Sequence, residues 1–271
     1  MRANEKVYIS LLGPFRVWVY GQELTLGPIR QQAVLLSLVR RHNQVVSVSR
    51  LLHDVWGEEP PRSGHRTIPP YIYRLRKLVP EGRKGWEGLP IERSREGYVL
   101  RVAPEQLDST VFDRLVRDGQ EAQRRGDLDT AYSLISQALQ MWGEEPLVGL
   151  SGPLAQSTRM RFMEQRLMVI EQRIQLAFLM GRHRDVIPEL RQHVEMNPLY
   201  EPMTRLLMIA LYTCDRHVEA LNVFQEMRKR LVEETGMEPG RKLQQAYEAV
   251  LRADLDPSGD LEGFVDGRRA G

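Results

Sequence analysis

The first twenty residues carry a short-period pattern of apolar and polar positions. Val7, Ile9 and Leu11 alternate with more polar residues, and apolar residues alternate again across 15–19 after a Gly-Pro pair. Alternation with a period of two is typical of half-buried strands, and a Tyr-Gly turn then leads into the segment QELTLG. The pattern therefore predicts a small antiparallel sheet at the start of the chain.

The pattern then changes to helical spacing. Residues 28–40 repeat apolar positions at helical spacing behind a proline, and a second short helix is expected between a serine cap and Gly57. A third amphipathic segment follows over 66–79, and 89–102 alternates again as a hairpin with Gly97 in its turn. A small sheet, three helices and a terminal hairpin, in this order, indicate a winged helix-turn-helix.

The third helix, with the sequence RTIPPYIYRLRK, has two unlike faces. On a helical wheel four apolar residues share one narrow sector, which predicts a buried stripe. These residues are Ile68, Ile72, Leu75 and Val79. Basic and aromatic side chains occupy the opposite face. Arg and Lys there are suited to phosphates or guanine edges, and Tyr73 is suited to a thymine methyl group.

Two prolines, Pro69 and Pro70, stand near the start of this helix. The first N–H groups of a helix have no partner within it, so proline loses no hydrogen bond there. A position deeper in the helix would cost roughly 3 kcal/mol. We therefore predict that both prolines lie in the first turn, with Thr67 as the cap and a late or kinked start.

From Asp108 onward the pattern is helical almost throughout, and it repeats. Gly181–Leu190 aligns with Asp215–Phe224 at an offset of 34 residues, which is the period of tetratricopeptide helix pairs. A weaker copy, Gly126–Leu139, lies 55 residues before the first of these. Stacked helix pairs form curved scaffolds that bind proteins, whereas the Gly- and Asp-rich tail over 255–271 is expected to be flexible.

The net charge of the chain is only +2, but it is unevenly distributed. Residues 1–104 hold 17 Lys and Arg against nine Asp and Glu, which gives +8, whereas residues 105–271 hold 21 against 27, which gives −6. A basic first part indicates a polyanionic partner, and an acidic second part indicates a different one. Chance remains the alternative, because unequal halves are common in proteins.

Several classes of protein are disfavoured by what the sequence lacks. A single cysteine, Cys214, excludes an internal disulfide and a thiolate zinc cluster. His183 and His217 occupy equivalent repeat positions, which favours a structural role over metal binding. We find no membrane-length apolar run, signal peptide, nucleophile–base pattern, paired carboxylates or phosphate loop. We expect no catalytic residue, metal, cofactor or membrane partner, and a cytoplasmic, nucleoid-associated location.

The chain resembles the Streptomyces antibiotic regulatory protein (SARP) family over residues 7–253. The matching pieces include, in order, LLGPFRV, RQQAVLLSLVRR, VVSVSRLLHDVWGEEPP, YIYRLRKLV, GYVLRV, ALQMWGEEPL, ALYTCDRHVEAL and EETGMEPGRKLQQ. The resemblance implies a mixed fold. An α+β winged helix of the OmpR type spans 1–104, an all-helical, tetratricopeptide-like bacterial transcriptional activation domain spans 105–254, and a flexible tail spans 255–271.

The resemblance also implies a function. Members of the family activate antibiotic biosynthesis genes, bind direct repeats overlapping the promoter −35 region and recruit RNA polymerase. The implied partners are double-stranded promoter DNA, the polymerase with its sigma factor, and a second copy side by side on DNA. Members usually carry polar or small residues where this chain has Pro69-Pro70, so its base preference is expected to differ. Longer members add an ATPase domain, whereas this sequence has no GxxxxGK motif, so nucleotide control is not expected.

Three groups of residues are expected to contact DNA, by analogy with winged helices that place one helix in the major groove and the wing in a minor groove. They are Arg66, Thr67, Tyr73, Arg74, Arg76 and Lys77 on the third helix, Ser47, Ser49 and Arg50 on the preceding helix, and Arg93 and Arg95 in the wing. The resemblance assigns a sigma-factor contact to Glu58, Glu59 and Arg62 in the loop between the helices. Trp56 beside this loop is expected in the core.

Each assignment has a simpler alternative. The basic face and the acidic loop are otherwise ordinary solvated surfaces, and Arg76 then pairs with carboxylates of the protein itself. For the whole chain, the alternative to a DNA-binding activator is a helical-repeat adaptor whose basic domain binds a second protein. An enzyme is disfavoured by the missing motifs. Retention on heparin or DNA, with a steep loss on adding salt, separates the activator from the adaptor.

Overall fold

The computed structural model of the chain describes residues 7–78 and 88–255. Val79 of the predicted stripe and residues 256–271 of the predicted tail lie outside the described residues. Contacts divide the chain into two compact units, of which the first comprises residues 1–118 and 136–167 and the second comprises residues 119–135 and 168–271. The boundary after residue 104 stays a prediction, because these units are not bounded there.

The first unit begins with an antiparallel sheet of three strands, β1 (Tyr8–Ser10), β2 (Arg16–Val19) and β3 (Gln22–Glu23). Ile9 is paired with Val17, and both side chains are fully buried. Tyr8 is paired with Trp18, and their ring centroids lie 5.8 Å apart. Paired side chains lie on one face of a sheet, so the alternation in the sequence is confirmed as one buried and one partly exposed face.

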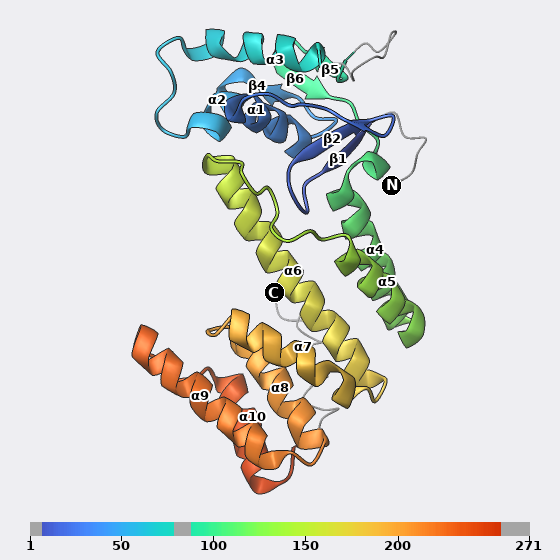
Figure 1. The fold of residues 1–271 in the computed structure, drawn as a ribbon, viewed down its shortest axis with the longest axis vertical. Coiled ribbons are helices and arrows are strands. Elements are labelled where there is room, and N and C mark those ends of the chain that lie inside the picture. Colours follow the sequence, from blue (N-terminus) through green and yellow to red (C-terminus); the bar gives the residue numbers. More distant parts are fainter. Residues whose placement is uncertain (1–6, 79–87, 256–271) are drawn as a thin grey trace. The chain divides into compact units, whose positions relative to one another are not determined.

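Three helices and a second sheet complete the winged helix (Figure 1). The helices are α1 (Ile29–Arg40), α2 (Val48–Trp56) and α3 (Ile68–Arg76), and a 3-10 turn (Gly64–Thr67) precedes α3. The second sheet comprises β4 (Val46–Ser47), β5 (Ile91–Arg93) and β6 (Gly97–Leu100), with β6 in the middle. The order of elements is the one that the sequence predicts, and β5 and β6 form the wing.

Gly97 is the first residue of β6 rather than part of the turn in which the sequence places it. It is paired with Ser47 of β4, and a Cβ atom at this position would lie 2.0 Å from the carbonyl oxygen of Val46. Such an approach is too close for any side chain, so glycine is required here for a different reason than the turn. It allows β4 to pair with the wing.

The remainder of the chain is helical. Its helices are α4 (Asp108–Arg124), α5 (Leu128–Gln140), α6 (Pro153–Leu179), α7 (His183–Met196), α8 (Glu201–Thr213), α9 (His217–Thr235) and α10 (Arg241–Arg252). The divisions between the two units fall inside α4, α5 and α6. Each of these three helices therefore contributes to both units.

Within the first unit, the helical segments pack directly on the first sheet. The backbone N–H groups of Leu11 and Leu12 donate to the Asp108 carboxylate at 2.8 and 3.0 Å. The N–H of Gly143 donates to the carbonyl of Leu12 at 3.0 Å. These bonds tie the loop after β1 to the start of α4 and to the segment after α5.

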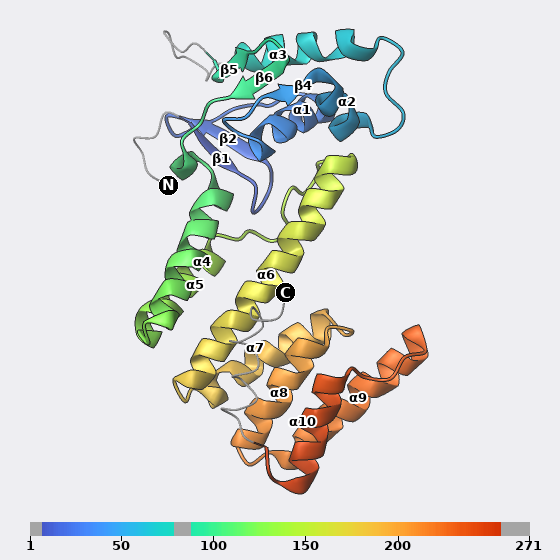
Figure 2. The same ribbon diagram turned by 180° about the vertical axis from the view of Figure 1, so that it is seen from behind.

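In the second unit, α7, α8, α9 and α10 pack one against the next (Figure 2). The predicted period is confirmed, because α7 begins at His183 and α9 at His217, 34 residues later. The ring of His183 lies 4.8 Å from that of Phe178, and the ring of His217 lies 4.6 Å from that of Tyr212. The two histidines therefore have the same packing role in successive helix pairs. Burial lowers the pKa of His183, which favours its neutral form.

Candidate nucleic-acid interface

One face of α3 is buried and orients the other face outward. Ile68, Ile72 and Leu75 are at most 1 % exposed, and α3 contacts both α1 and α2. This confirms the described part of the predicted stripe. Removing such side chains from water is the main term that fixes a helix on its neighbours.

Both prolines lie in the first turn of α3, as predicted. The helix begins at Ile68, and Pro69 and Pro70 are its second and third residues. The prediction that the Thr67 side chain caps the helix is wrong. A capping residue needs an extended backbone, but the 3-10 turn holds Thr67 in helical geometry, and its hydroxyl lies 2.5 Å from that of Ser63 instead.

We expect replacement of both Pro69 and Pro70 by alanine to change the free energy of unfolding by about 1 kcal/mol or less. First-turn prolines remove no hydrogen bond of the helix, so alanine mainly makes the unfolded chain more flexible. Pro188 provides the control, because it lies inside α7, where alanine should restore a bond and stabilise the protein. Urea titrations of the three proteins measure this. A gain from the double change as large as that from Pro188→Ala would contradict first-turn placement.

The outward face of α3, extended by Arg66 in the 3-10 turn before it and by Lys77 directly after it, is basic and aromatic. Arg66, Arg74 and Lys77 are exposed, and Tyr73 is 63 % exposed. The Arg74 guanidinium lies 5.8 Å from the ring centroid of Tyr71, which restrains it in a position facing outward. Among the residues that the structure describes, none of these three cations has an ion pair with a carboxylate. Their charge is therefore available to an external anion.

Arg76 lies at the edge of this face and has a partner within the protein. Its Nε donates to the carbonyl of Ile91 in β5 at 2.6 Å, and its guanidinium lies 6.0 Å from the ring centroid of Tyr98. Within the residues that the structure describes, its partner is a backbone carbonyl, and no carboxylate forms an ion pair with it. Arg76 links α3 to the wing, and a DNA contact by this side chain stays a prediction.

The start of α2 has the predicted serine cap. The Ser47 hydroxyl accepts a hydrogen bond from the backbone N–H of Arg50 at 3.1 Å. The Ser49 hydroxyl lies 3.0 Å from Nε2 of His65 in the 3-10 turn before α3. Ser47, Ser49 and Arg50 are all exposed, so these internal bonds do not remove them from solvent. Their contact with a phosphate stays a prediction.

A buried carboxylate holds α2 against α1. Asp54 is 3 % exposed and is bonded to the Ser37 hydroxyl at 2.6 Å, to Arg41 at 2.7 Å and to Arg50 at 2.9 Å. Sequence reasoning missed this network. The spacing of four residues between Arg50 and Asp54 was an available signal, whereas Ser37 and Arg41 lie on another helix and gave none.

The wing and the loop after α2 present exposed charges. Arg93 ends β5, and Arg95 lies in the turn of the hairpin. Glu58, Glu59 and Arg62 are exposed in the loop between α2 and the 3-10 turn. Trp56, at the base of this loop, is only partly buried. The ring centroid of Trp56 lies 6.2 Å from that of Tyr71. The Arg30 guanidinium lies 5.2 Å from the Trp56 ring centroid.

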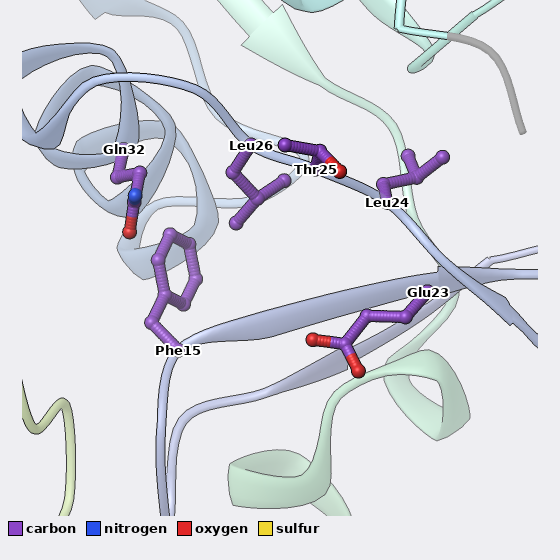
Figure 3. A pocket seen from close by; sticks show the side chains of 6 residues that line it. All are labelled: Phe15, Glu23, Leu24, Thr25, Leu26 and Gln32. Atoms are coloured by element: carbon purple, nitrogen blue, oxygen red, sulfur yellow. The ribbon is translucent and has the colours of Figure 1, made fainter.

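A hollow of about 380 Å³ lies beside the first sheet (Figure 3), and no residue of α3 lines it. It is lined by Phe15, Glu23, Leu24, Thr25, Leu26 and Gln32. The one charged group in this lining, Glu23, forms an ion pair with Arg16 at 3.5 Å. A lining without a cation does not fit a nucleic-acid phosphate, so this hollow is not part of the candidate interface.

No group of three or more His, Cys, Asp or Glu side chains within 7–78 and 88–255 is placed to hold a metal ion. Over the same residues, the helices are all too short or too polar to cross a membrane.

Comparison with known proteins identifies both parts of the chain. The family profile described as "Transcriptional regulatory protein, C terminal" matches residues 21–100, and the one described as "Bacterial transcriptional activator domain" matches residues 107–251. The solved structure of Mycobacterium tuberculosis EmbR, in complex with a low-affinity phosphopeptide, aligns with a TM-score of 0.87 at 26 % identity. The alignment covers 97 % of this chain and 69 % of EmbR.

Two Streptomyces proteins show how much of a relative the chain spans. Regulatory protein AfsR of Streptomyces griseus is 35 % identical over 245 residues, which cover 90 % of this chain but only 24 % of AfsR. The chain thus spans about a quarter of the length of that relative. Regulatory protein DnrI of Streptomyces peucetius is 33 % identical over 251 residues, which cover 91 % of this chain and 92 % of DnrI. Since both domains match in order and DnrI aligns along nearly its whole length, the chain belongs to the SARP family of transcriptional regulators, which join an OmpR-type winged helix to a bacterial transcriptional activator domain.

Proposed function

We propose that the chain is an activator that binds promoter DNA through α3 and the wing and recruits RNA polymerase. The observation that carries the proposal is the exposed face of Arg66, Tyr73, Arg74 and Lys77, which lies opposite a fully buried stripe. A helix so oriented presents to a polyanion cations that form no ion pair with any described carboxylate. Membership of the SARP family supports genes of antibiotic or other secondary-metabolite biosynthesis as the targets.

The exposed side chains of α3 divide into two kinds of contact. Arg66, Arg74 and Lys77 are suited to phosphates or to guanine edges in the major groove. Tyr73 and Pro70 together form an apolar surface suited to a thymine methyl group. Because two prolines in the first turn supply no N–H donors, that end of the helix reads bases through side chains rather than through its backbone.

Arg93 and Arg95 supply the wing contact with the neighbouring minor groove. Arg76 holds the wing to α3, since it bonds the carbonyl of Ile91. At the other end of the motif, the first turn of α2 presents exposed Ser49 and Arg50 at the positive end of the helix dipole, which suits a phosphate.

The proposed DNA site is a pair of direct repeats that overlap the promoter −35 element. Two copies then lie side by side, with half-sites spaced by one DNA turn of about 10–10.5 bp. Direct repeats require a head-to-tail contact between copies rather than a two-fold one. Family membership supports this arrangement. The basic winged helix with its single recognition helix, α3, supports it as well.

The test of the proposal is mutation of the outward face of α3. We expect Arg74→Ala and Lys77→Ala each to weaken binding of a promoter fragment in gel-shift titrations without lowering the melting temperature. A lost phosphate contact should lower the salt slope by about one unit, whereas a lost base contact should cost about 1–3 kcal/mol and relax specificity. Arg117→Ala is the control, because Arg117 is exposed on α4, away from the proposed interface. Unchanged DNA affinity in both variants would contradict the proposal. It would favour the alternative of a helical-repeat adaptor whose basic domain binds a second protein.

A further inference from the structure

A second basic site lies where the end of α1 faces the first turns of α6, within the first unit. A hollow of about 260 Å³ at this place is lined by Arg40, Arg41, Leu154, Ser157, Thr158 and Arg161. Three of the six lining residues are arginines, and none is acidic. Residues of α3, of the wing and of the start of α2 do not line it, so it is distinct from the proposed DNA interface.

The three arginines of this hollow differ in whether a carboxylate of the protein balances their charge. Arg41 forms an ion pair with buried Asp54 at 2.7 Å. Arg40 and Arg161 both lie against the ring of Phe162, at 5.5 and 5.6 Å from its centroid. Stacking on a ring fixes the plane of a guanidinium but leaves its N–H donors free. In the described parts of the chain, neither Arg40 nor Arg161 forms an ion pair.

Arg40 is the least favourably placed of these charges. Burial, followed by the charges of Arg161 and Arg41, lowers the pKa of Arg40 to about 10, and the charge of Asp113 opposes this only in part. The group still carries its charge near neutral pH. A partly buried charge is normally balanced by a counter-charge, and within 7–78 and 88–255 no carboxylate forms an ion pair with Arg40.

We infer that this hollow binds a small oxyanion of the phosphate class, either free phosphate or the phosphate group of a small metabolite. Arg40 and Arg161 provide forked N–H donors that match phosphate oxygens. The volume is below the roughly 300–1,000 Å³ of pockets for drug-sized ligands, which favours a small ligand. The bound anion bridges α1 of the winged helix and α6.

The experiment is calorimetric titration of the whole chain with inorganic phosphate and, separately, with ribose 5-phosphate, at an ionic strength held constant with chloride. Saturable binding of either probe is expected. Arg161→Gln should weaken it about ten- to a hundredfold, as expected for a lost charge-assisted hydrogen bond. Arg161 is exposed, so this variant should keep the parent melting temperature in chloride, and Arg117→Gln on α4 should bind like the parent.

The outcomes separate the sources of the anion. Tighter binding of inorganic phosphate identifies the free ion, and tighter binding of ribose 5-phosphate identifies a phosphorylated metabolite; both support the proposal. Heats no larger than those of chloride dilution, or equal binding by Arg161→Gln and the parent, would overturn it.

A DNA titration of Arg161→Gln is the last experiment. If Arg161→Gln lowers the salt slope of DNA binding, the hollow is a contact for the DNA backbone and the proposal is wrong, whereas an unchanged slope supports it.

Discussion

Asp108→Ala is expected to lower the free energy of unfolding by about 3 kcal/mol or more. The Asp108 carboxylate is 3 % exposed and accepts hydrogen bonds from Leu11 and Leu12, almost a hundred residues earlier in the chain, and from Ser109. Alanine would leave these buried N–H groups without an acceptor, at a cost of roughly 1–3 kcal/mol each. The loss is large compared with a typical total stability of about 5–15 kcal/mol.

The hydrogen bonds at this site also act on the titration of the acid. Burial raises the pKa of Asp108 above its ordinary value, and the hydrogen bonds from Leu12, Ser10 and Leu11 oppose this only in part. Asp108→Asn keeps the size of the side chain but turns an NH₂ group toward backbone donors. We therefore expect Asp108→Asn to be less stable than the parent as well, although less so than Asp108→Ala.

Asp129→Ala is the matched control for this prediction. Asp129 also lies in the first turn of a helix, α5, but it is exposed and has no hydrogen bond or ion pair within the described residues. Both variants lose a carboxylate near a helix N-terminus, worth about 0.3–1 kcal/mol, and only Asp108→Ala loses the tie to the first sheet. Urea unfolding followed by tryptophan fluorescence is a suitable measurement, because all four tryptophans lie before residue 143. If both variants lost the same free energy of unfolding, the hydrogen bonds between Asp108 and the loop after β1 would contribute nothing to stability.

Glu58→Lys combined with Glu59→Lys is expected to abolish most of the activation while DNA affinity is kept or raised. Both carboxylates are exposed in the loop after α2, and neither has an ion pair in the described parts of the chain. The predicted loss of activation rests on the proposed recruitment of polymerase. The part of sigma that binds the −35 element must be basic, so two carboxylates beside the DNA are complementary to it, and two lysines are repulsive.

The measurement is transcription in vitro with purified polymerase, beside a gel shift on the same promoter fragment. Glu233→Lys combined with Glu234→Lys is the control, since it makes the same change of charge on an exposed adjacent pair in α9. The control should transcribe like the parent. Full activity of the Glu58 and Glu59 variant would show that the loop is not the contact and that the helical domain recruits polymerase alone.

Most of the secondary structure follows from patterns within short segments. The alternation at Val7, Ile9 and Leu11 depends on the period of a strand, and the stripe of Ile68, Ile72 and Leu75 depends on the period of a helix. The proline pair was located correctly because the cost of proline depends on its position in a single helix. The prediction that Thr67 caps α3 is wrong because the 3-10 turn before α3 was not predicted.

The candidate interface is predictable to a similar degree. The exposed face of Tyr73, Arg74 and Lys77 follows from one helix with one buried stripe, whereas Arg66 lies in the 3-10 turn before it. Whether a given side chain is free or engaged does not follow from that periodicity. Arg76 bonds a carbonyl fifteen residues later, and Ser49 bonds His65, because the fold brings separate elements together.

The sequence by itself determined the winged-helix order, the repeat of 34 residues and the basic outward face of α3, because each depends on residues that are neighbours along the chain or along one helix. The tertiary structure alone decided the contacts between distant segments. Asp108 accepts bonds from the loop after β1, Asp54 joins two helices, and Arg40 and Arg161 meet on Phe162. No local periodicity encodes such contacts, since their energy depends on which groups folding removes from water together.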